Sequence, residues 1–473
     1  MPAARLAFPI ALRLAPGRGA SAALHLQLRE AILEGRLATG FRLPPTRELA
    51  LTLGVARTTV VLAYEMLVAE GYVRVRQGDG TYVQSLRRSS PRASLKAHAA
   101  APPAVTTSGM ASPRFDLRLG SPDISGFPFD VWRRLAAKGW KSSAGHAYEA
   151  SDPAGFAPLR EAIVQHASAS RAVSCGTDDV VVTAGAQQAF DLLARTLVAS
   201  GMVVAVEDPG YRPARMAFEA AGARIAGVPV DEEGMMVDRI PKTARVICVT
   251  PSHQFPLGVT MSPARRSALL ECARKQDAIV VEDDYDCEFR YDSRPLDALQ
   301  TLAPGRVCYV GTFSKTMFPA LRLGYTIVPE PLRQRLLALR SVADGFGAPA
   351  PQWALAAFIR EGHLHRHVRR MQRLYAQRRA GLMAGLSEGL TVGLQGRIRL
   401  LPSNAGLHFS LRALVPLDWP RVLARAAQLD MALEPCSRHA IHKRADDCCA
   451  IGFGLLKDEQ IATVIDRLQA VLA

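Results

Sequence analysis

Lys315 follows a strand-like apolar run and has phosphate-binding side chains around it. The run 306–310 (Arg-Val-Cys-Tyr-Val) predicts a buried parallel strand, so Lys315 would lie in the turn at its carboxyl end, where open α/β sheets bind their ligands. Thr312 and Ser314 place hydroxyl groups beside the lysine, and Arg322 follows seven residues after it. A lysine amine with hydroxyl and guanidinium neighbours suits a phosphorylated aldehyde held as a Schiff base.

The composition of the chain makes this lysine more informative. Only 8 of the 58 basic residues are Lys, so most interchangeable surface cations are already Arg. Arg cannot form a Schiff base, and a Lys retained at a strand end is therefore a candidate nucleophile. The alternative interpretation is a surface lysine in a turn rich in Ser and Thr.

Strand-like and helical stretches alternate through the C-terminal three quarters of the chain. This alternation predicts an α/β fold, with a mainly parallel sheet covered by helices on both faces. The expected strands are Val180–Thr183, Val203–Val206, Val246–Thr250, Ile279–Glu282 and Val307–Val310.

Three of these strands end in groups suited to the same ligand. After the first strand, Gly185, Ala186 and Gln187 open a helix whose backbone amides could hold a phosphate. After the second, Tyr211 offers an aromatic ring to stack on a planar cofactor. The fourth ends in Glu-Asp-Asp-Tyr at 282–285, where a carboxylate could hold a pyridine nitrogen protonated and make the ring an electron sink. The alternative for these acids is a helix N-cap cluster.

Positive charge is concentrated near the N-terminus. Residues 1–115 carry 15 Arg or Lys against 6 Asp or Glu, a net charge of +9, while residues 116–473 carry 43 against 37, a net charge of +6. Such an imbalance is expected of a region that meets a polyanion. The alternative is a basic, Arg-rich proteome in which the charge has no binding role. Between the two regions, residues 85–115 are rich in Ala, Ser and Pro and predict a flexible linker.

The basic region predicts a helix-turn-helix followed by a β-hairpin wing. Apolar residues recur at helical spacing in 23–34 and 57–70, a short helix is expected between them, and 72–83 reads as a hairpin with a glycine-rich turn. Arg57, Thr58 and Thr59, at the start of the third helix, would face base edges and phosphates, because recognition helices read DNA with their N-terminal residues. A three-helix module that docks on another protein is the alternative.

The stretch 43–83 (LPPTRELALTLGVARTTVVLAYEMLVAEGYVRVRQGDGTYV) resembles the winged helix-turn-helix of GntR-type regulators over almost its whole length. We therefore expect a DNA-binding domain over residues 1–84. The resemblance implies that Arg47, Arg57, Thr58 and Thr59 contact double-stranded DNA, and that the wing tip at Gly80 lies in or near the minor groove.

Four motifs further along the chain resemble those of fold-type I aminotransferases, in the same order. They are Thr-Ala-Gly-Ala-Gln at 183–187, Asp-Pro-Gly-Tyr at 208–211, Asp-Asp-Tyr-Asp at 283–286 and Thr-Phe-Ser-Lys at 312–315. Together with the N-terminal module, the chain from about residue 20 onward resembles the MocR family of bacterial regulators. Residues 116–473 would then form an aminotransferase-like domain that binds pyridoxal 5′-phosphate.

This resemblance implies a role for each candidate site residue. Lys315 would carry the Schiff base, and the phosphate would be held by the following groups: Arg322, Ser314, Thr312 and the turn of Gly185, Ala186 and Gln187. The ring would stack on Tyr211, its pyridine nitrogen would meet Asp283, and its hydroxyl would meet Tyr285. Asp284 remains an alternative for the nitrogen contact, because the sequence leaves one residue of register open.

Two positions depart from the aminotransferase pattern. Phe255-Pro256-Leu257-Gly258 stands where aminotransferases usually have Asn-Pro-Thr-Gly, so the Asn that supports the cofactor hydroxyl is absent. Ala450 stands where many aminotransferases have the arginine that clamps a substrate carboxylate, and its loss removes a bidentate anchor. Ordinary transamination is then not expected unless another arginine, such as Arg215, substitutes. His253 and His408 either line the pocket or are hydrogen-bonded scaffold.

We therefore expect a cytoplasmic transcriptional regulator that senses a small amine effector, or pyridoxal 5′-phosphate itself, through its aminotransferase-like domain. One alternative is a working aminotransferase with an accessory DNA-binding domain, and another is a cofactor sensor that regulates vitamin B6 synthesis. The resemblance also implies a homodimer, head-to-tail. The eight Cys show no CxxC spacing, so reduced thiols and no metal site are expected, and no apolar run reaches membrane-spanning length.

Overall fold

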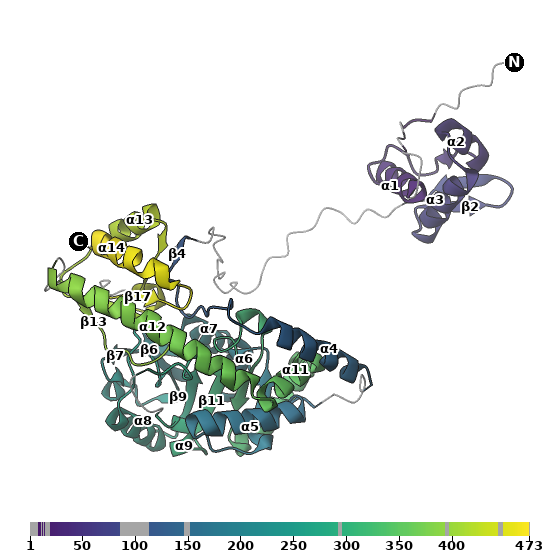
Figure 1. The fold of residues 1–473 in the computed structure, drawn as a ribbon. Coiled ribbons are helices and arrows are strands. Elements are labelled where there is room, and N and C mark those ends of the chain that lie inside the picture. Colours follow the sequence, from purple (N-terminus) through teal and green to yellow (C-terminus); the bar gives the residue numbers. More distant parts are fainter. Residues whose placement is uncertain are drawn as a thin grey trace. The chain divides into compact units, whose positions relative to one another are not determined.

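The structure is a computed structural model that divides into two compact units, Met1–Ala104 and Val105–Ala473 (Figure 1). It describes residues 8–10, 12, 14, 19–85, 113–145, 152–291, 296–392, 397–442 and 448–472, with the backbone alone at 143–145 and 388–392. The boundary between the units falls inside the predicted linker, of which residues 86–112 lie outside the described residues. Each unit is considered by itself.

The first unit is a helix-turn-helix with a β wing. Its elements are α1 (Ala20–Leu33), β1 (Arg42–Leu43), α2 (Thr46–Leu53), α3 (Arg57–Ala69), β2 (Val73–Arg76) and β3 (Gly80–Val83). The strands form an antiparallel sheet in the order β1-β3-β2. Gly54 turns the chain between α2 and α3 in the left-handed conformation, with φ of 64°, which glycine adopts without a steric penalty.

A single apolar core holds this unit together. Leu24 and Leu28 of α1 pack with Leu49 of α2, with Val60 of α3 and with Val83 of the wing, and all five are almost fully buried. Because every element contributes to the same core, the start of α3 and the hairpin are fixed relative to one another.

The second unit is built on an eight-stranded sheet in the order β5-β12-β11-β10-β9-β6-β7-β8. The strands are β5 (Val180–Thr183), β6 (Val203–Asp208), β7 (Arg224–Asp231), β8 (Gly234–Met235), β9 (Ala244–Val249), β10 (Ile279–Asp284), β11 (Val307–Thr312) and β12 (Gly324–Ile327). Only β12 and β8 run antiparallel to their neighbours. The α/β fold with a mainly parallel sheet is therefore as predicted, and each of the five expected strands is present.

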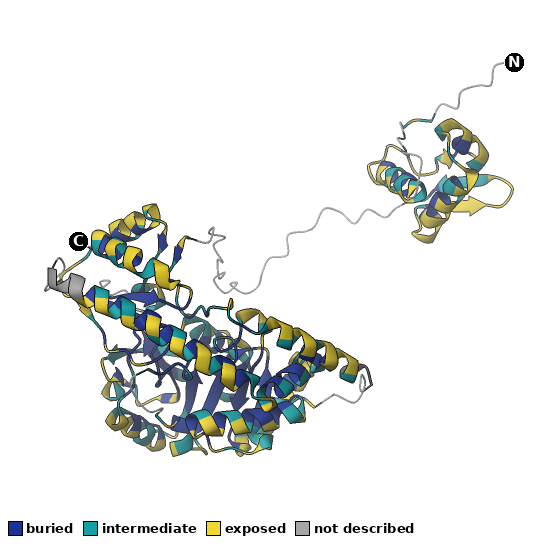
Figure 2. Cartoon of the chain, viewed as in Figure 1, coloured by how far each residue is buried: buried dark blue, intermediate teal, exposed yellow. Residues whose placement is uncertain are grey.

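Helices cover both faces of this sheet. They are α4 (Phe129–Gly145), α5 (Ala157–Arg171), α6 (Ala186–Leu197), α7 (Arg212–Ala220), α8 (Pro263–Lys275), α9 (Leu299–Leu302), α10 (Glu330–Ala343) and α11 (Pro349–Arg360). Alternate residues of one strand enter different cores: Val181 packs with α6 and α10, while Val180 and Val182 pack with α5 and α11. The central strands are consequently apolar along most of their length and buried, as Figure 2 shows.

A smaller, antiparallel sheet completes the second unit. It contains β13 (Ile398–Leu400), β14 (His408–Ala413), β17 (Cys448–Gly452) and β16 (Glu434–Pro435), in that order. The 30-residue helix α12 (His363–Val392), with α13 (Trp419–Gln428) and α14 (Ile461–Leu472), packs on it through one apolar core. A short parallel pair, β4 (Phe115–Asp116) with β15 (Met431–Ala432), ties the start of this unit to its end.

The topology places five strand ends together. Strands β5, β6, β9, β10 and β11 all point the same way, so their carboxyl ends share one edge of the large sheet. An isolated bridge between Arg290 and Ala405 joins the segment after β10 to the segment before β14. Among the described residues, no helix is both long enough and apolar enough to cross a membrane.

Candidate functional site

The predicted phosphate-binding residues come together where β5 and β11 end. Gly185 is the N-cap of α6 and has φ of 78°. The Arg322 guanidinium donates to the Ala184 carbonyl at 2.9 Å. A Cβ added to Gly185 would lie 3.2 Å from that guanidinium, so only glycine lets the arginine lie this close to the helix start. The arrangement presents a cation beside the free amides of Ala186 and Gln187, which suits an anion.

Two hydroxyl groups extend this cradle. Thr312 Oγ1 and Ser314 Oγ are 3.0 Å apart, and the Ser314 amide donates to Thr312 Oγ1 at 3.2 Å. The Gln187 side chain instead donates to the Pro213 carbonyl at 3.0 Å, which fixes α6 against α7. Gln187 therefore offers its backbone amide to the cradle, with its side chain occupied elsewhere.

The Lys315 side chain is largely withdrawn from solvent at the same edge of the sheet. Its amine donates to the Gly120 carbonyl, and a Cβ added to Gly120 would lie 2.7 Å from the Lys315 nitrogen. Burial lowers the pKa of the Lys315 amine, although the carboxylates of Asp286 and Asp283 oppose this change. A lowered pKa increases the fraction of neutral amine, the form that attacks an aldehyde.

Gly120 was not identified from the sequence. It lies 195 residues before Lys315 and has φ of 62°. The only sequence signal was a Gly-Ser-Pro triplet at 120–122 after a short stretch of alternating apolar and charged residues, which by itself predicts a turn.

The neighbouring acids Asp283 and Asp284 have different surroundings, because successive side chains of a strand face opposite sides. Asp284 accepts hydrogen bonds from Arg171 Nε at 2.6 Å and from the Tyr309 hydroxyl at 2.8 Å. Asp283 is equally buried, and Oδ1 of each of the two acids has no hydrogen-bond partner among the described residues; of the two, Asp283 lines the pocket beside Tyr211. Burial, aided by nearby carboxylates, raises the pKa of Asp283 well above its ordinary value, while Lys315 opposes the change.

Tyr211 lies at the same edge of the sheet and lines a pocket there. Its side chain is 36% exposed, and its ring stands edge-on to Phe255, with ring centroids 5.4 Å apart. Tyr211, Asp283 and Arg215 line one pocket between α7 and the ends of β6 and β9. The two predicted ring contacts thus come from different strands of a single pocket.

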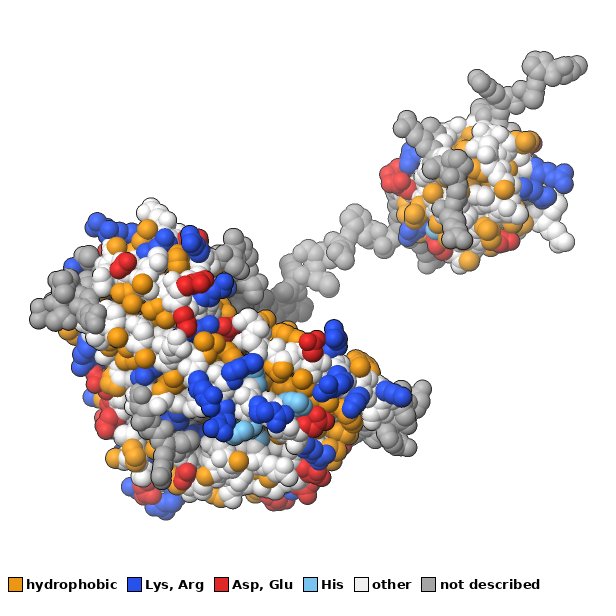
Figure 3. Space-filling view, in the orientation of Figure 1, with side chains coloured by type: hydrophobic (Ala, Val, Ile, Leu, Met, Phe, Trp, Pro, Cys, Tyr) orange, Lys and Arg blue, Asp and Glu red, His pale blue; other side chains and the backbone are white. Residues whose placement is uncertain are grey.

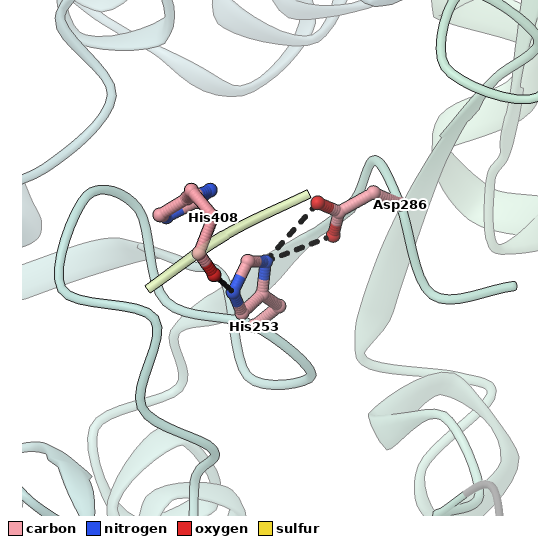
Figure 4. A group of neighbouring side chains, drawn as sticks. All are labelled: His253, Asp286 and His408. Atoms are coloured by element: carbon pink, nitrogen blue, oxygen red, sulfur yellow. Dashed lines mark hydrogen bonds and ion pairs between the residues drawn. The ribbon is translucent and has the colours of Figure 1, made fainter. Parts of the chain in front are cut away.

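The Tyr285 hydroxyl is already engaged by the protein. It donates to the His253 carbonyl at 2.8 Å and lies 3.1 Å from His253 Nδ1. His253 Nδ1 is 3.1 Å from both oxygens of Asp286, and its Nε2 is 3.2 Å from the His408 carbonyl (Figure 4). Both nitrogens of His253 therefore contact oxygen atoms.

The His253–Asp286 pair connects the large sheet to the small one. The Leu407 amide donates to Asp286 Oδ2 at 3.2 Å. Gly406 passes so close that a Cβ would lie 2.0 Å from the His253 ring. His408 is fully buried, and burial together with His253 lowers the pKa of its imidazole well below the ordinary value. These contacts give His253 a scaffolding role at the point where β14 meets the pocket.

Glu207, at the end of β6, also lines this pocket and was missed by the sequence analysis. Its Oε2 accepts hydrogen bonds from the Thr250 amide at 3.1 Å, from the Thr250 hydroxyl at 2.5 Å and from Gln254 Nε2 at 3.3 Å. Its Oε1 has no partner among the described residues. Burial raises the pKa of Glu207 to about 7. The sequence signal was an acid directly before Asp-Pro-Gly-Tyr, which cannot be distinguished locally from a solvated strand end.

The two departures from the aminotransferase pattern lie in one apolar cluster. Ala450 is fully buried on β17, where it pairs with Ser410 of β14 and Glu434 of β16. It packs in a cluster whose other buried members are Leu257, Val259, Leu401, Cys436 and Cys448. The position where a carboxylate clamp would stand is therefore enclosed by aliphatic and thiol groups.

In the first unit, the predicted DNA contacts gather around the start of α3. Arg47, Arg57 and Thr58 are exposed, Thr59 is half-buried, and Arg57 Nε donates to the Thr46 hydroxyl at 3.4 Å, which joins α3 to α2. A shallow groove runs along α3 between Arg57 and Glu65.

The wing carries further cations that the sequence analysis did not single out. A Cβ added to Gly80 would lie 2.8 Å from Arg42 Nε, and the Arg76 guanidinium lies over the Tyr82 ring, 4.6 Å from its centroid. Arg42, Arg74 and Arg76 are all exposed. The hairpin therefore presents a row of guanidinium groups next to its glycine turn.

Comparisons with known proteins match both units. Residues 20–83 match the family model of bacterial regulatory proteins of the gntR family, and residues 116–416 match that of aminotransferase class I and II. The chain is 36% identical to a probable rhizopine catabolism regulatory protein MocR of Rhizobium meliloti, over 94% of this chain and 92% of that one. It is 32% identical to the pyridoxine biosynthesis transcriptional regulator PdxR of Corynebacterium glutamicum, over 97% of each chain. The structure is similar to that of a multiple substrate aminotransferase from Thermococcus profundus, with a TM-score of 0.70 and 25% identity over 77% of this chain and 92% of that one.

We predict that Glu207→Gln changes the pH dependence of stability. Because the native pKa of about 7 is above the ordinary value of 4.5, Glu207 stabilises the fold most below pH 4.5, and this contribution is lost as the pH rises through 7. The full effect is roughly 3 kcal/mol at most. Gln keeps the acceptor for Thr250 without a charge, so the variant should match the wild type at pH 5 and have a higher Tm at pH 8.

Thermal unfolding at the two pH values measures this difference. The exposed Glu330→Gln serves as the control and should shift Tm by the same small amount at both. An equal shift of Tm for Glu207→Gln at pH 5 and pH 8 would contradict the raised pKa of Glu207.

Proposed function

Since the chain belongs to the family of MocR-type transcriptional regulators, which join a gntR-type domain to an aminotransferase class I and II domain, we propose that it binds pyridoxal 5′-phosphate and uses that domain to control its affinity for DNA. The observation that carries this proposal is the convergence of three features at one edge of the large sheet. They are the amine of Lys315, the cation–helix cradle at Arg322 and Gly185, and the unpartnered carboxyl of Asp283.

When bound, the cofactor supplies an aldehyde for the Lys315 amine and an electron-withdrawing pyridine ring. The cradle neutralises the phosphate through Arg322, the Thr312 and Ser314 hydroxyls and the helix start at Gly185. Asp283 would meet the ring nitrogen and favour its protonated form, because it lines the pocket and its Oδ1 has no partner among the described residues, whereas Asp284 is held through Oδ2 by Arg171 and Tyr309. A buried acid without a partner is costly, and a protonated nitrogen would satisfy it.

Tyr211 and Tyr285 contribute to the ring contacts in different ways. The partly exposed ring of Tyr211 stacks on the cofactor. The Tyr285 hydroxyl is held by His253, which is itself paired with Asp286, and it would contact the ring hydroxyl of the cofactor. This scaffold takes over the supporting role of the Asn that Phe255 replaces.

The effector domain serves for sensing rather than turnover. A carboxylate brought to Ala450 would enter an apolar cluster with no cation to receive it, and an unpaired buried carboxylate is strongly disfavoured. The effector is therefore a small amine recognised through groups other than an α-carboxylate. A second candidate is the cofactor itself, so that DNA affinity reports vitamin B6 supply, and the same apolar cluster favours it.

Double-stranded operator DNA is the macromolecular partner, and the protein acts on the chromosome in the cytoplasm. Arg47, Arg57, Thr58 and Thr59 contact the duplex together with the Gly80 wing. A head-to-tail homodimer is sterically open, because about 30 linker residues can span up to roughly 100 Å. A dimer also allows two winged helices to bind two half-sites.

We predict that Lys315 alone carries the covalently bound cofactor. The protein saturated with pyridoxal 5′-phosphate should be yellow, and borohydride should bleach it while fixing the cofactor to Lys315. Lys315→Ala and the charge-preserving Lys315→Arg should both lose the colour, since neither side chain forms the bond. Peptide mapping identifies the modified residue. The variant of an exposed lysine, Lys242→Ala, should behave as the wild type. An adduct on a lysine other than Lys315 would show that Lys315 does not carry the cofactor.

We predict that Arg57 and Arg47 affect DNA binding differently. On a duplex selected from random DNA by the wild-type protein, Arg57→Ala should cost about 1–3 kcal/mol and relax base preference at one position, because it reads a base. Arg47→Ala should weaken binding to all sequences alike. It should also reduce the slope of the logarithm of the binding constant against the logarithm of salt concentration by about 1. Titrations at several salt concentrations distinguish the two. Equal, sequence-independent effects would show that both residues contact phosphate only.

We predict that common α-amino acids bind the cofactor-loaded protein weakly. Without an arginine at 450, they lose a contact worth about 1.5–3 kcal/mol, or about ten- to a hundredfold in affinity. Absorption titrations with the twenty amino acids should show changes only at millimolar concentrations, while amines recognised through other groups should act at lower ones. A micromolar response to a plain α-amino acid would revive the aminotransferase function, with another arginine as the clamp.

A further inference from the structure

We propose that the second unit has its own DNA-contacting surface, formed by the exposed arginines of α12. This inference rests on the DNA-binding function proposed above and extends it to a part of the protein outside the winged helix. The arginine face, as we call it, consists of Arg366, Arg369, Arg370 and Arg373, all of which are exposed.

The sequence of α12 is unusual in its charge. Residues 363–387 contain six arginines and no Asp or Glu. The arginine face occupies positions i, i+3, i+4 and i+7, so its members share one side of the helix. The opposite side buries Leu364, Met371 and Tyr375 in the protein core. The two faces of this helix are thus sharply different.

The other two arginines of α12 have clear structural roles. Arg378 is buried and bonds to Asp123 Oδ2 at 2.8 Å and to the Gly454 carbonyl at 2.7 Å. Arg379 is buried as well and donates to the Ser403 carbonyl. These two side chains attach the helix to distant segments.

The arginine face has no such partners. In the part of the chain that the structure describes, none of its four members forms an ion pair with a carboxylate; Arg366 donates to the Glu361 carbonyl, and Arg370 contacts His367. Like charges at i, i+4 destabilise a helix by about 0.2–0.5 kcal/mol per pair. The face therefore costs helix stability and contributes no ion pair to the fold, which favours a role in binding.

A second row of cations lies on α4. Arg134, Lys138 and Lys141 are exposed at i, i+4 and i+7 of that helix. Both α4 and α12 pack on α11, and Arg370 reaches Gly126 in the segment before α4, where a Cβ would lie 3.2 Å from its guanidinium. Figure 3 shows the blue side chains gathered over these two helices. The two rows lie on neighbouring helices, with hydrophobic and a few acidic side chains between them.

Charge complementarity identifies the occupant as duplex DNA. The seven side chains of the two rows carry more positive charge than the whole net excess of residues 116–473, which is +6. Guanidinium and ammonium groups without fixed acid partners suit phosphates, and DNA presents one negative charge per about 1.7 Å of helix axis. Such contacts add affinity without sequence preference.

The test compares two full-length variants with equal loss of charge. The first replaces the arginine face: Arg366→Gln, Arg369→Gln, Arg370→Gln and Arg373→Gln. The control replaces four exposed arginines elsewhere on the same unit: Arg224→Gln, Arg335→Gln, Arg421→Gln and Arg425→Gln. Both are titrated, beside the wild type, with a fluorescent mixed-sequence 60-bp duplex at several salt concentrations, and their oligomeric state is measured by light scattering.

We expect the arginine-face variant to bind this duplex at least tenfold more weakly at about 50 mM salt. The slope of the logarithm of its binding constant against the logarithm of salt concentration should become shallower by about 3. The control should stay within about twofold of the wild type. A photo-crosslinking amino acid placed at Arg369 should form an adduct with the duplex, whereas one placed at Arg425 should not. The crosslink separates direct contact from a general effect of net charge.

Three outcomes would overturn the inference. Equal losses in both variants would mean that only net charge matters, and unchanged binding in the arginine-face variant would mean that the face is not used. A changed oligomeric state of that variant would show that a second copy of the chain covers the face. If the wild type itself fails to bind any duplex, the proposed function fails instead, so the two failures are distinguishable.

Discussion

The arrangement of the pocket depends on how three consecutive buried acids of β10 are compensated. Glu282 accepts hydrogen bonds from the Leu299 and Gln300 amides, each at 2.9 Å, and Asp284 is paired with Arg171. Charges buried so deeply are tolerated only with close partners. Asp283, between them, has no such partner for its Oδ1 and faces the pocket. The ion pair between Arg171 and Asp284 therefore compensates the neighbouring acid, while Asp283 is the acid of the strand that lines the pocket.

The rest of the pocket is held by backbone that approaches side chains closely. Gly185 admits the Arg322 guanidinium, Gly120 admits the Lys315 amine, and Gly406 admits the His253 ring. At each point a Cβ would intrude on the side chain that the site needs, and all three glycines have positive φ. The pocket is consequently fixed by the packing of loops from different parts of the chain, as expected of a site that must be formed before its ligand arrives.

The pocket also joins the two sheets of the second unit. His253 and Asp286 lie in the loops that follow β9 and β10 of the large sheet, yet they bond to the backbone of His408 and Leu407 at the start of β14. The Ala450 cluster lies on the next strand of the small sheet and includes Leu257, two residues after Phe255. A ligand that contacts these residues touches both sheets. An effector can favour one relative position of the two sheets only if its binding free energy differs between their positions. Contact with both sheets is the simplest way to meet this requirement.

The sequence alone determined the elements and indicated the type of chemistry. Apolar runs of strand length, their alternation with helices and a lysine at a strand end are local features, so the α/β fold and the winged helix followed without tertiary information, as did the proposal for Lys315. The tertiary structure decided which groups face one another. Asp283 and Asp284 are adjacent in the chain, and the contacts of Asp284 with Tyr309 and with Arg171, 113 residues away, separate their environments. The unpartnered oxygen of Glu207, the approach of Gly120 to Lys315 and the shared cluster of Leu257 and Ala450 were equally hidden. Each arises from packing between segments distant in sequence, and local patterns carry no information about such pairings.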